Sequence, residues 1–280
     1  MNKSITQATQ NDKQISKSIK RFFARFHVSS ALKASNAYKK KGVPVMEIFQ
    51  YLFLLIFPNR SMYMNLIIGR NTPDFANDTV YRFMKMIQIN WIRFTTTLSA
   101  RIIKDAILPL DSEERANVLI IEDSMFERNR SKKVELLAKV YDHAKHKYRF
   151  GFRMLTLSWS DVNLDENEIV RIYGKRWDIE VFFKVCKSYL NLSRECNSLS
   201  YDAMTTHTAV VFTRYMMLSL ESRESNDNRS LGELFYTFQM KCPISHGYRH
   251  FKCCFKCSEQ CLRKIPNCQK RKSANWWMHL

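Results

Sequence analysis

The fold class is indicated by one stretch in the middle of the sequence, Val118-Leu119-Ile120-Ile121-Glu122-Asp123-Ser124. Four apolar residues that run directly into two acidic residues are typical of a short buried strand ending in carboxylates. A carboxylate at the end of a strand is a good position for a metal ligand. A second strand is predicted over Gly151 to Trp159, and the charged segment from Glu127 to Lys133 is predicted to be a loop.

Most of the remaining sequence has a helical pattern. Apolar residues recur at helical spacing from Ile15 to Phe26, and Val45 to Phe57 is apolar but shorter than the roughly 20 residues that span a bilayer, which predicts a buried helix. Further helices are expected from near Asp78, over Ile169 to Leu190 and over Tyr201 to Leu220. The sequence therefore predicts an α/β chain that is mostly helical overall.

The charge of the chain favours a polyanionic partner. Lys and Arg number 45 against 26 Asp and Glu, a formal net charge of +19, and such an excess attracts nucleic acid through phosphate neutralisation. Thr79, Arg82 and Lys85 suit contact with DNA in a helical N-terminal domain. The alternatives are a solvated basic face on a helical bundle, a merely basic protein, or binding to an anionic membrane. Without a secretory signal in Met1 to Lys20, we expect a cytoplasmic, nucleoid-associated protein.

One predicted helix carries a stripe of polar residues. Tyr173, Arg176, Glu180 and Lys187 fall within an arc of roughly 60° at about 100° per residue, and the adjacent face holds apolar residues, namely Ile172, Ile179, Phe183, Cys186 and Leu190. A carboxylate can hold a divalent metal while Arg, Lys and Tyr bind phosphates on either side of a scissile bond. The alternative is a salt-bridged surface with Glu180 paired to Arg176 or Lys184.

This stripe, read as Y-x2-R-x3-E-x6-K together with its flanking residues Ile172 to Lys184, resembles the signature of bacterial insertion-sequence DDE transposases of insertion-sequence family four. Ile120 to Ser124 resembles the strand of the first catalytic aspartate in that family, and the similarity extends from the N-terminal region to about Phe238.

The resemblance implies a helical DNA-binding domain followed by a ribonuclease-H-like catalytic domain. It also implies Mg²⁺-dependent cleavage and strand transfer on double-stranded DNA at the ends of an insertion sequence. Asp123 and Glu180 would be catalytic metal ligands, and Tyr173, Arg176 and Lys187 would contact DNA phosphate.

The chain departs from the family between these two carboxylates. Only 57 positions (180 − 123) separate Asp123 from Glu180, which leaves little room for the later strand that carries the second aspartate. The candidates are Asp161, Asp165 and Asp178. We place the first two in the loop before the helix, and Asp178 points about 160° away from Glu180 on the helix. Asp161 is therefore only a weak candidate metal ligand.

An internal deletion explains the short interval. Leu157 to Asp161 resembles the second strand of the family, and Asp161 to Glu166 resembles the segment before the glutamate helix, so the two halves join at Ser160-Asp161. The deletion would have removed the missing strands and the second aspartate. We expect a truncated domain with exposed strand edges, exposed apolar surface and no competent two-metal site.

The C-terminal tail is predicted to be a frameshift product. After Phe238 the chain carries nine Lys and Arg against one acidic residue, Glu259, and permitted codons shifted by one base can encode an amphipathic sequence. A zinc site is the alternative we consider unlikely, because the residues from His250 to Cys261 lack regularly spaced CxxC pairs. The predicted domains are thus 1–112, helical and DNA-binding; 113–238, the truncated catalytic domain; and 239–280, the tail.

Three functions are consistent with this sequence. The first is a degenerate transposase that binds DNA without cutting it, and the second is an active enzyme that recruits Asp161. The third is a non-enzymatic regulator that occupies element ends, as a homodimer or as a heterodimer with an intact transposase.

Overall fold

The computed structural model describes residues 18–57, 62, 73–110, 115–143, 145–163, 176–193, 198–224 and 229–241. By packing, the chain divides into two compact units. We call residues 1–83 and 213–272 the helical unit, and residues 84–212 and 273–280 the sheet unit. These are packing units, and the functional division at residues 112 and 238 stays a prediction.

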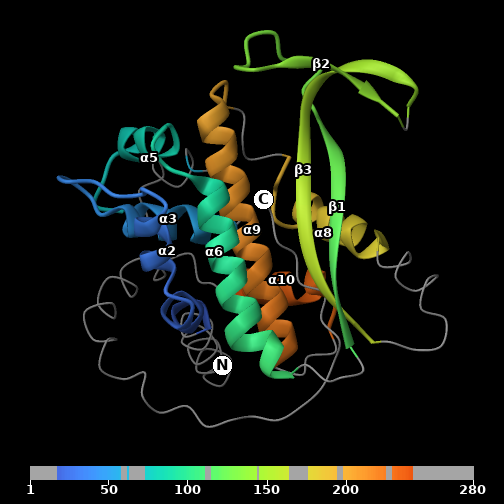
Figure 1. The fold of residues 1–280 in the computed structure, drawn as a ribbon. Helices are drawn as coiled ribbons and strands as arrows, with labels where there is room; N and C mark the ends of the chain where they lie inside the picture. Colours follow the sequence, from blue (N-terminus) through green and yellow to red (C-terminus); the bar gives the residue numbers. More distant parts are fainter. Residues whose placement is uncertain are drawn as a thin grey trace, which may run out of the picture. The chain divides into compact units, whose positions relative to one another are not determined.

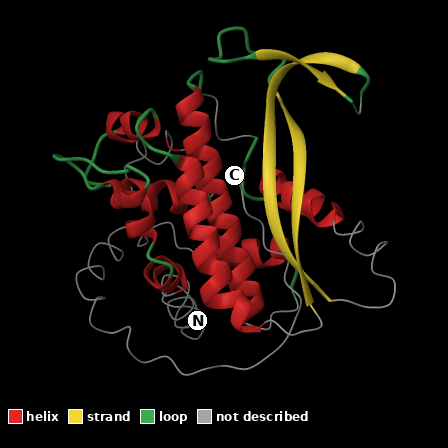
Figure 2. Ribbon diagram, in the orientation of Figure 1, coloured by secondary structure: helices red, strands yellow, loops and turns green. Residues whose placement is uncertain are grey.

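The described part of the helical unit is built from helices (Figures 1 and 2). Residues 18–25 are helical, followed by α2 (Val28–Ala34), α3 (Val45–Leu54), nearly all of α5 (Asn77–Met84), the second half of α9 (Tyr201–Glu224) and α10 (Leu231–Lys241). The buried helix predicted from Val45, the helix near Asp78 and the helix from Tyr201 are confirmed. α10 begins with a capping box in which the backbone N–H of Glu233 donates to Ser230 Oγ and that of Ser230 donates to Glu233 Oε2.

Aromatic residues form the core of the helical unit. Phe23 packs edge-on against Phe53 with ring centroids 5.0 Å apart, and Phe57 packs against Phe53 and against Phe238 from α10. Of the apolar positions predicted from the N-terminal helical spacing, Ile15 lies outside the described residues, and Ile19, Phe22, Phe23 and Phe26 are all buried. The helical unit therefore has a continuous core of the kind that aromatic packing stabilises.

A buried arginine completes the end of α3. The Nε of Arg214 donates to the carbonyl of Phe53 at 3.0 Å, and another N–H of the same guanidinium donates to the carbonyl of Leu52. The last carbonyls of a helix have no partner within that helix. Arg214, which is 1% exposed, supplies a donor from α9 to each of these carbonyls, and the Leu52 carbonyl also accepts from the N–H of Leu55 at 3.4 Å.

The sheet unit combines three antiparallel strands with helices. α6 (Trp91–Ile102) is capped by Asn90, whose side chain accepts from the N–H of Arg93. The helix continues into a π-helical turn (Ile103–Ile107) and a 3₁₀ turn (Leu108–Leu110). The strands are β1 (Arg115–Glu127), β2 (Ala138–Asp142) and β3 (Lys147–Asn163), in the order β1-β3-β2. α8 (Arg176–Ser188) lies against β1. Mixed helices and strands agree with the predicted α/β class, whereas a ribonuclease-H-like architecture stays a proposal.

The first strand differs from its prediction in length and in burial. β1 has 13 residues and runs to Glu127, so Asp123 lies inside the strand and not at its end. Leu119 and Ile121 are 60% and 66% exposed, so the strand is not a buried one. Because side chains alternate along a strand, an apolar run supplies both faces of the sheet, and no described residue covers Leu119 and Ile121 on one of these faces. The second predicted strand is confirmed within the longer β3.

One face of the sheet buries polar side chains. Thr156, Ser158 and Ser160, which alternate along β3, are fully buried. The other face exposes a set of side chains that we call the open face: Leu119, Ile121, Asp123, Arg153 and Leu155. Exposed apolar surface was expected for a truncated domain, and the open face has this character.

No helix in the described part of the chain is long and apolar enough to cross a membrane.

Candidate functional site

The carboxylate of Asp123 is held by an arginine on the neighbouring strand. The Nε of Arg153 donates to Asp123 Oδ2 at 2.9 Å, and Nη2 of the same guanidinium donates to the same oxygen. The third nitrogen, Nη1, donates to the carbonyl of Tyr141 at 3.2 Å. Arg153 thus joins all three strands, since it stands on β3 and binds groups of β1 and β2. A cation already neutralises the charge that a metal ion would neutralise.

Glu180 lies on the exposed side of α8, as the predicted polar stripe requires. The apolar side of the helix is buried, with Ile179 and Cys186 both fully enclosed. Burial raises the pKa of the Cys186 thiol well above its ordinary value, because desolvation disfavours the thiolate. The sequence therefore predicted correctly which side of this helix packs inward and which faces solvent.

Of the three residues expected to contact phosphate, only Lys187 has a described side chain. Lys187 is exposed near the end of α8, and its Nζ lies 5.5 Å from the ring centroid of Phe183. Arg176 is the first residue of α8, while the position of its side chain and the whole of Tyr173 lie outside the described residues. Contact of these residues with DNA stays a prediction.

Asp161 lies within β3, and its predicted position in a loop is wrong. It stands opposite Asn117 in a register that is continuous to Asp123, which stands opposite Leu155. Six residues of strand at roughly 3.4 Å per residue separate Asp161 from Leu155, about 20 Å. Since Mg²⁺ binds oxygen at about 2.1 Å, these two aspartates do not share an ion. Pairing with β1 overrides the turn preference of Ser160-Asp161.

The other candidate aspartates contribute no further ligand. Asp165 lies outside the described residues, and Asp178 stands on α8 with a side chain that is not described. Within the described ranges, no three His, Cys, Asp or Glu side chains come close enough together to hold a metal ion. The donor set around Asp123 does not fit Mg²⁺, because its nearest charged partner is itself a cation. The cysteines of the predicted frameshifted tail lie outside the described residues.

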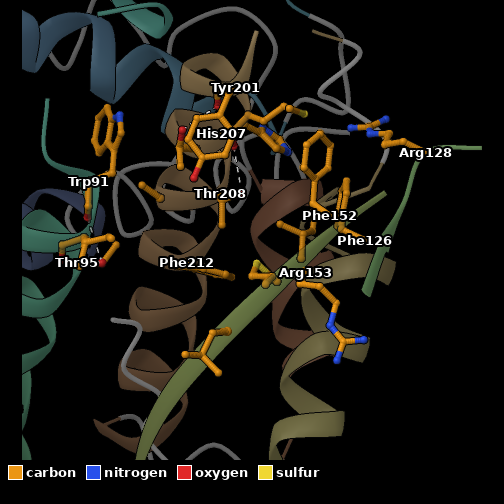
Figure 3. Close-up of a pocket in the computed structure, with 17 residues that line it drawn as sticks. Trp91, Thr95, Phe126, Arg128, Phe152, Arg153, Tyr201, His207, Thr208 and Phe212 are labelled. Atoms are coloured by element: carbon orange, nitrogen blue, oxygen red, sulfur yellow. Dashed lines mark hydrogen bonds between the residues drawn. The ribbon is translucent and has the colours of Figure 1, made fainter. Parts of the chain in front are cut away.

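An aromatic cavity of about 250 Å³ lies in the sheet unit (Figure 3). Its walls come from α6, β1, β3 and α9 and include Trp91, Phe126, Phe152, Tyr201 and Phe212. The hydroxyls of Thr95 and Thr208 donate to carbonyls of their own helices, so their hydrogens are already engaged. The sequence did not predict this cavity, because its lining residues come from four separate elements.

A group of basic residues gathers in the helical unit. Partial burial is the larger cause, and the positive charge of Arg82 the smaller cause, of a lowered pKa of Lys39. The two side chains therefore interact electrostatically although they are 43 positions (82 − 39) apart in the sequence. Lys40 and Lys41 follow as exposed residues. We call Lys39, Lys40, Lys41 and Arg82 the basic group. Of these four residues, only Arg82 was predicted from the sequence to contact DNA. Of the other two residues predicted with it, Thr79 lies on α5 and Lys85 directly follows the end of α5.

Comparison with known proteins found one family. Residues 79–217 match the family model of the transposase DDE domain, a range that contains β1, Asp123 and Glu180. A search of curated proteins and a search of solved structures each found no match. The family match supports a DDE transposase, in agreement with the resemblance found in the sequence.

Proposed function

We propose that this chain is an internally deleted transposase of a bacterial insertion sequence, from insertion-sequence family four, that binds the element's DNA ends without cleaving them. The family match supports the transposase part of this proposal. The ion pair between Asp123 and Arg153 is the observation that favours loss of cleavage.

Loss of cleavage follows from what the reaction requires. DNA cleavage by such enzymes depends on divalent metal ions, which activate the attacking oxygen and stabilise the leaving oxygen between several carboxylates. Here the first carboxylate is bound to a guanidinium, and Asp161 stands about 20 Å away along the sheet. Glu180 of α8 is the other proposed ligand, and these carboxylates are too few to hold two metal ions.

DNA binding is supported by charge. The net charge of +19 favours association with a polyanion, and in the basic group the positive charge of Arg82 lies close enough to Lys39 to lower the pKa of that lysine. Neutralising phosphates releases condensed counterions, so binding through such a group weakens steeply as salt rises. Tyr173, Arg176 and Lys187 remain proposed contacts on the catalytic side.

The same combination of retained charge and lost chemistry favours a second candidate, a non-enzymatic regulator that occupies element ends or joins an intact transposase. The two candidates differ in effect and not in contacts. A remnant that only occupies the ends competes with an intact enzyme for DNA, so excess end DNA relieves its effect, whereas a regulator that joins the intact transposase inhibits it in trans even when end DNA is in excess.

The experiment that tests the proposal combines binding and cleavage. The purified chain is titrated into labelled element-end DNA and into random DNA of equal length, and Mg²⁺ is then added, with the intact enzyme of the family as positive control. We expect preferential end binding without nicking. Nicking that disappears in Asp161→Ala would support the active-enzyme alternative, and no binding to element-end DNA at low salt would contradict end binding.

A further inference from the structure

β1 is an edge strand of the sheet. In the order β1-β3-β2, and within the described residues, β3 is the only strand that pairs with β1. β1 has 13 residues and contains no proline and no lysine, the residues with which proteins commonly block edge strands. An edge of this length presents a row of backbone donors and acceptors that another strand can satisfy.

The register identifies which backbone groups point outward. The N–H of Arg128 donates to the carbonyl of Phe150 at 2.7 Å, and this pair continues the register of β1 with β3. Hydrogen-bonded pairs alternate with non-hydrogen-bonded pairs in an antiparallel ladder. The even-numbered residues of β1 therefore direct their backbone groups toward β3. The odd-numbered residues, among them Asn117, Leu119, Ile121 and Asp123, direct theirs toward the free edge.

We propose that two copies of this chain pair through the β1 edge, as antiparallel strands around a two-fold axis at Ile120. In this register Leu119 of one copy stands opposite Ile121 of the other, and the reverse pair forms across the axis. Asn117 stands opposite Asp123 at each end of this central segment. Odd-numbered residues meet odd-numbered residues, so the outward backbone groups of both strands find partners.

The side chains of the two strands are complementary in this register. Leu119 and Ile121 are 60% and 66% exposed in the single copy, and cross-strand pairing places each beside an apolar side chain of the second copy. An amide opposite a carboxylate allows a hydrogen bond between Asn117 and Asp123. A register centred on Ile121 would instead place Leu119 opposite Asp123, an apolar side chain against a charged one.

Arg153 also favours the pairing. Charged side chains on an edge strand discourage association with a second strand, and Asp123 is such a residue on β1. Because Arg153 neutralises it within each copy, the carboxylate repels a second strand less. The pairing depends on β1 and its neighbour alone, so it goes beyond the proposed DNA function and does not require it.

The test is the mass of the full chain in solution, measured by light scattering and sedimentation at high ionic strength, where attraction to co-purifying nucleic acid is screened. We expect a dimer for the wild type and a monomer for Ile121→Lys. Leu155→Lys is the matched control, because Leu155 is 62% exposed on the same open face but stands on β3, away from the edge. It should remain a dimer.

A mixing experiment tests the register. Leu119→Glu and Ile121→Lys are each expected to be monomeric. An equimolar mixture of the two is expected to form a heterodimer, because the carboxylate introduced at position 119 of one chain then faces the ammonium introduced at position 121 of the other. Circular dichroism checks that each variant is folded. A monomeric wild type, open-ended oligomers, a Leu155→Lys variant as monomeric as Ile121→Lys, or two folded single variants that do not associate on mixing would each overturn the proposal.

Discussion

Arg153 donates two N–H groups to one oxygen of Asp123, and these two residues stand diagonally across β1 and β3. The pair occupies the position where the family resemblance implies a metal ligand. Their side chains are 39% and 43% exposed, so water reaches both groups. An exposed pair of this kind contributes about 0.2–1 kcal/mol to folding, which is far less than its effect on the chemistry proposed for Asp123.

Replacing Arg153 should therefore hardly change the stability of the chain. We expect Arg153→Gln to lower the free energy of unfolding by about 1 kcal/mol or less, since the pair it breaks is solvent-exposed. The measurement is urea denaturation followed by circular dichroism. Arg149→Gln is the comparison, because Arg149 is only 17% exposed and pairs with Glu127 and Asp142. A larger loss for Arg153→Gln than for Arg149→Gln contradicts this ranking.

Replacing Arg214 should destabilise the helical unit strongly. Arg214→Met removes one donor from each of the Leu52 and Phe53 carbonyls. The Leu52 carbonyl keeps the N–H of Leu55 at 3.4 Å, and removing the partner of a buried acceptor such as the Phe53 carbonyl costs roughly 1–3 kcal/mol. Denaturant unfolding measures the loss. Arg21→Met, which breaks the Arg21–Glu221 pair with Arg21 47% exposed, serves as control and should lose about 1 kcal/mol or less. Equal losses in the two variants would show that Arg214 does not cap α3.

Removing charge from the basic group should weaken DNA binding and its salt dependence. If Lys40 and Lys41 each neutralise one phosphate, Lys40→Gln/Lys41→Gln lowers the slope of log K against log salt by about 1.8, at roughly 0.9 per contact. Fluorescence anisotropy of labelled duplex DNA measures this slope. Lys132→Gln/Lys133→Gln removes the same charge from an exposed loop of the sheet unit and should change the slope less. An equal change of the slope in both double variants would contradict binding of DNA at the basic group.

The pKa of Lys39 reports on the same group. Partial burial is the larger cause of the lowered pKa of Lys39, and the positive charge of Arg82 is the smaller cause. Arg82→Gln should therefore raise the pKa of Lys39 without restoring its ordinary value, and bound phosphate should also raise it because an anion favours the charged amine. Side-chain NMR of the lysine ammonium measures both effects. A pKa unchanged by Arg82→Gln would mean that the two residues do not interact.

The sequence predicted the elements whose signal is local. The apolar runs and helical spacings identified α3, α5 and α9, and the inward side of α8, because a helix makes its hydrogen bonds within one segment. The resemblance of residues 120–124 and 172–184 to the transposases was also visible without a structure, and the family match at residues 79–217 agrees with it.

The rest depends on pairing between distant segments. The length of β1 and the strand position of Asp161 both follow from pairing between residues that are 24 (151 − 127) to 48 (163 − 115) positions apart, and no local pattern encodes that register. The Arg153 partner of Asp123 was missed for the same reason. β2 was not predicted, because Ala138–Asp142 is short and has few apolar residues in an alternating pattern. Its periodicity is therefore too weak to distinguish a strand from a loop.

We propose that Asp123 does not serve metal-dependent cleavage in this chain. The most direct measurement is single-turnover nicking of element-end DNA in Mg²⁺ by the wild type and by Asp123→Asn, under conditions where the DNA is bound. We predict no nicked product from either protein. Mg²⁺-dependent nicking by the wild type that is abolished by Asp123→Asn would contradict the claim.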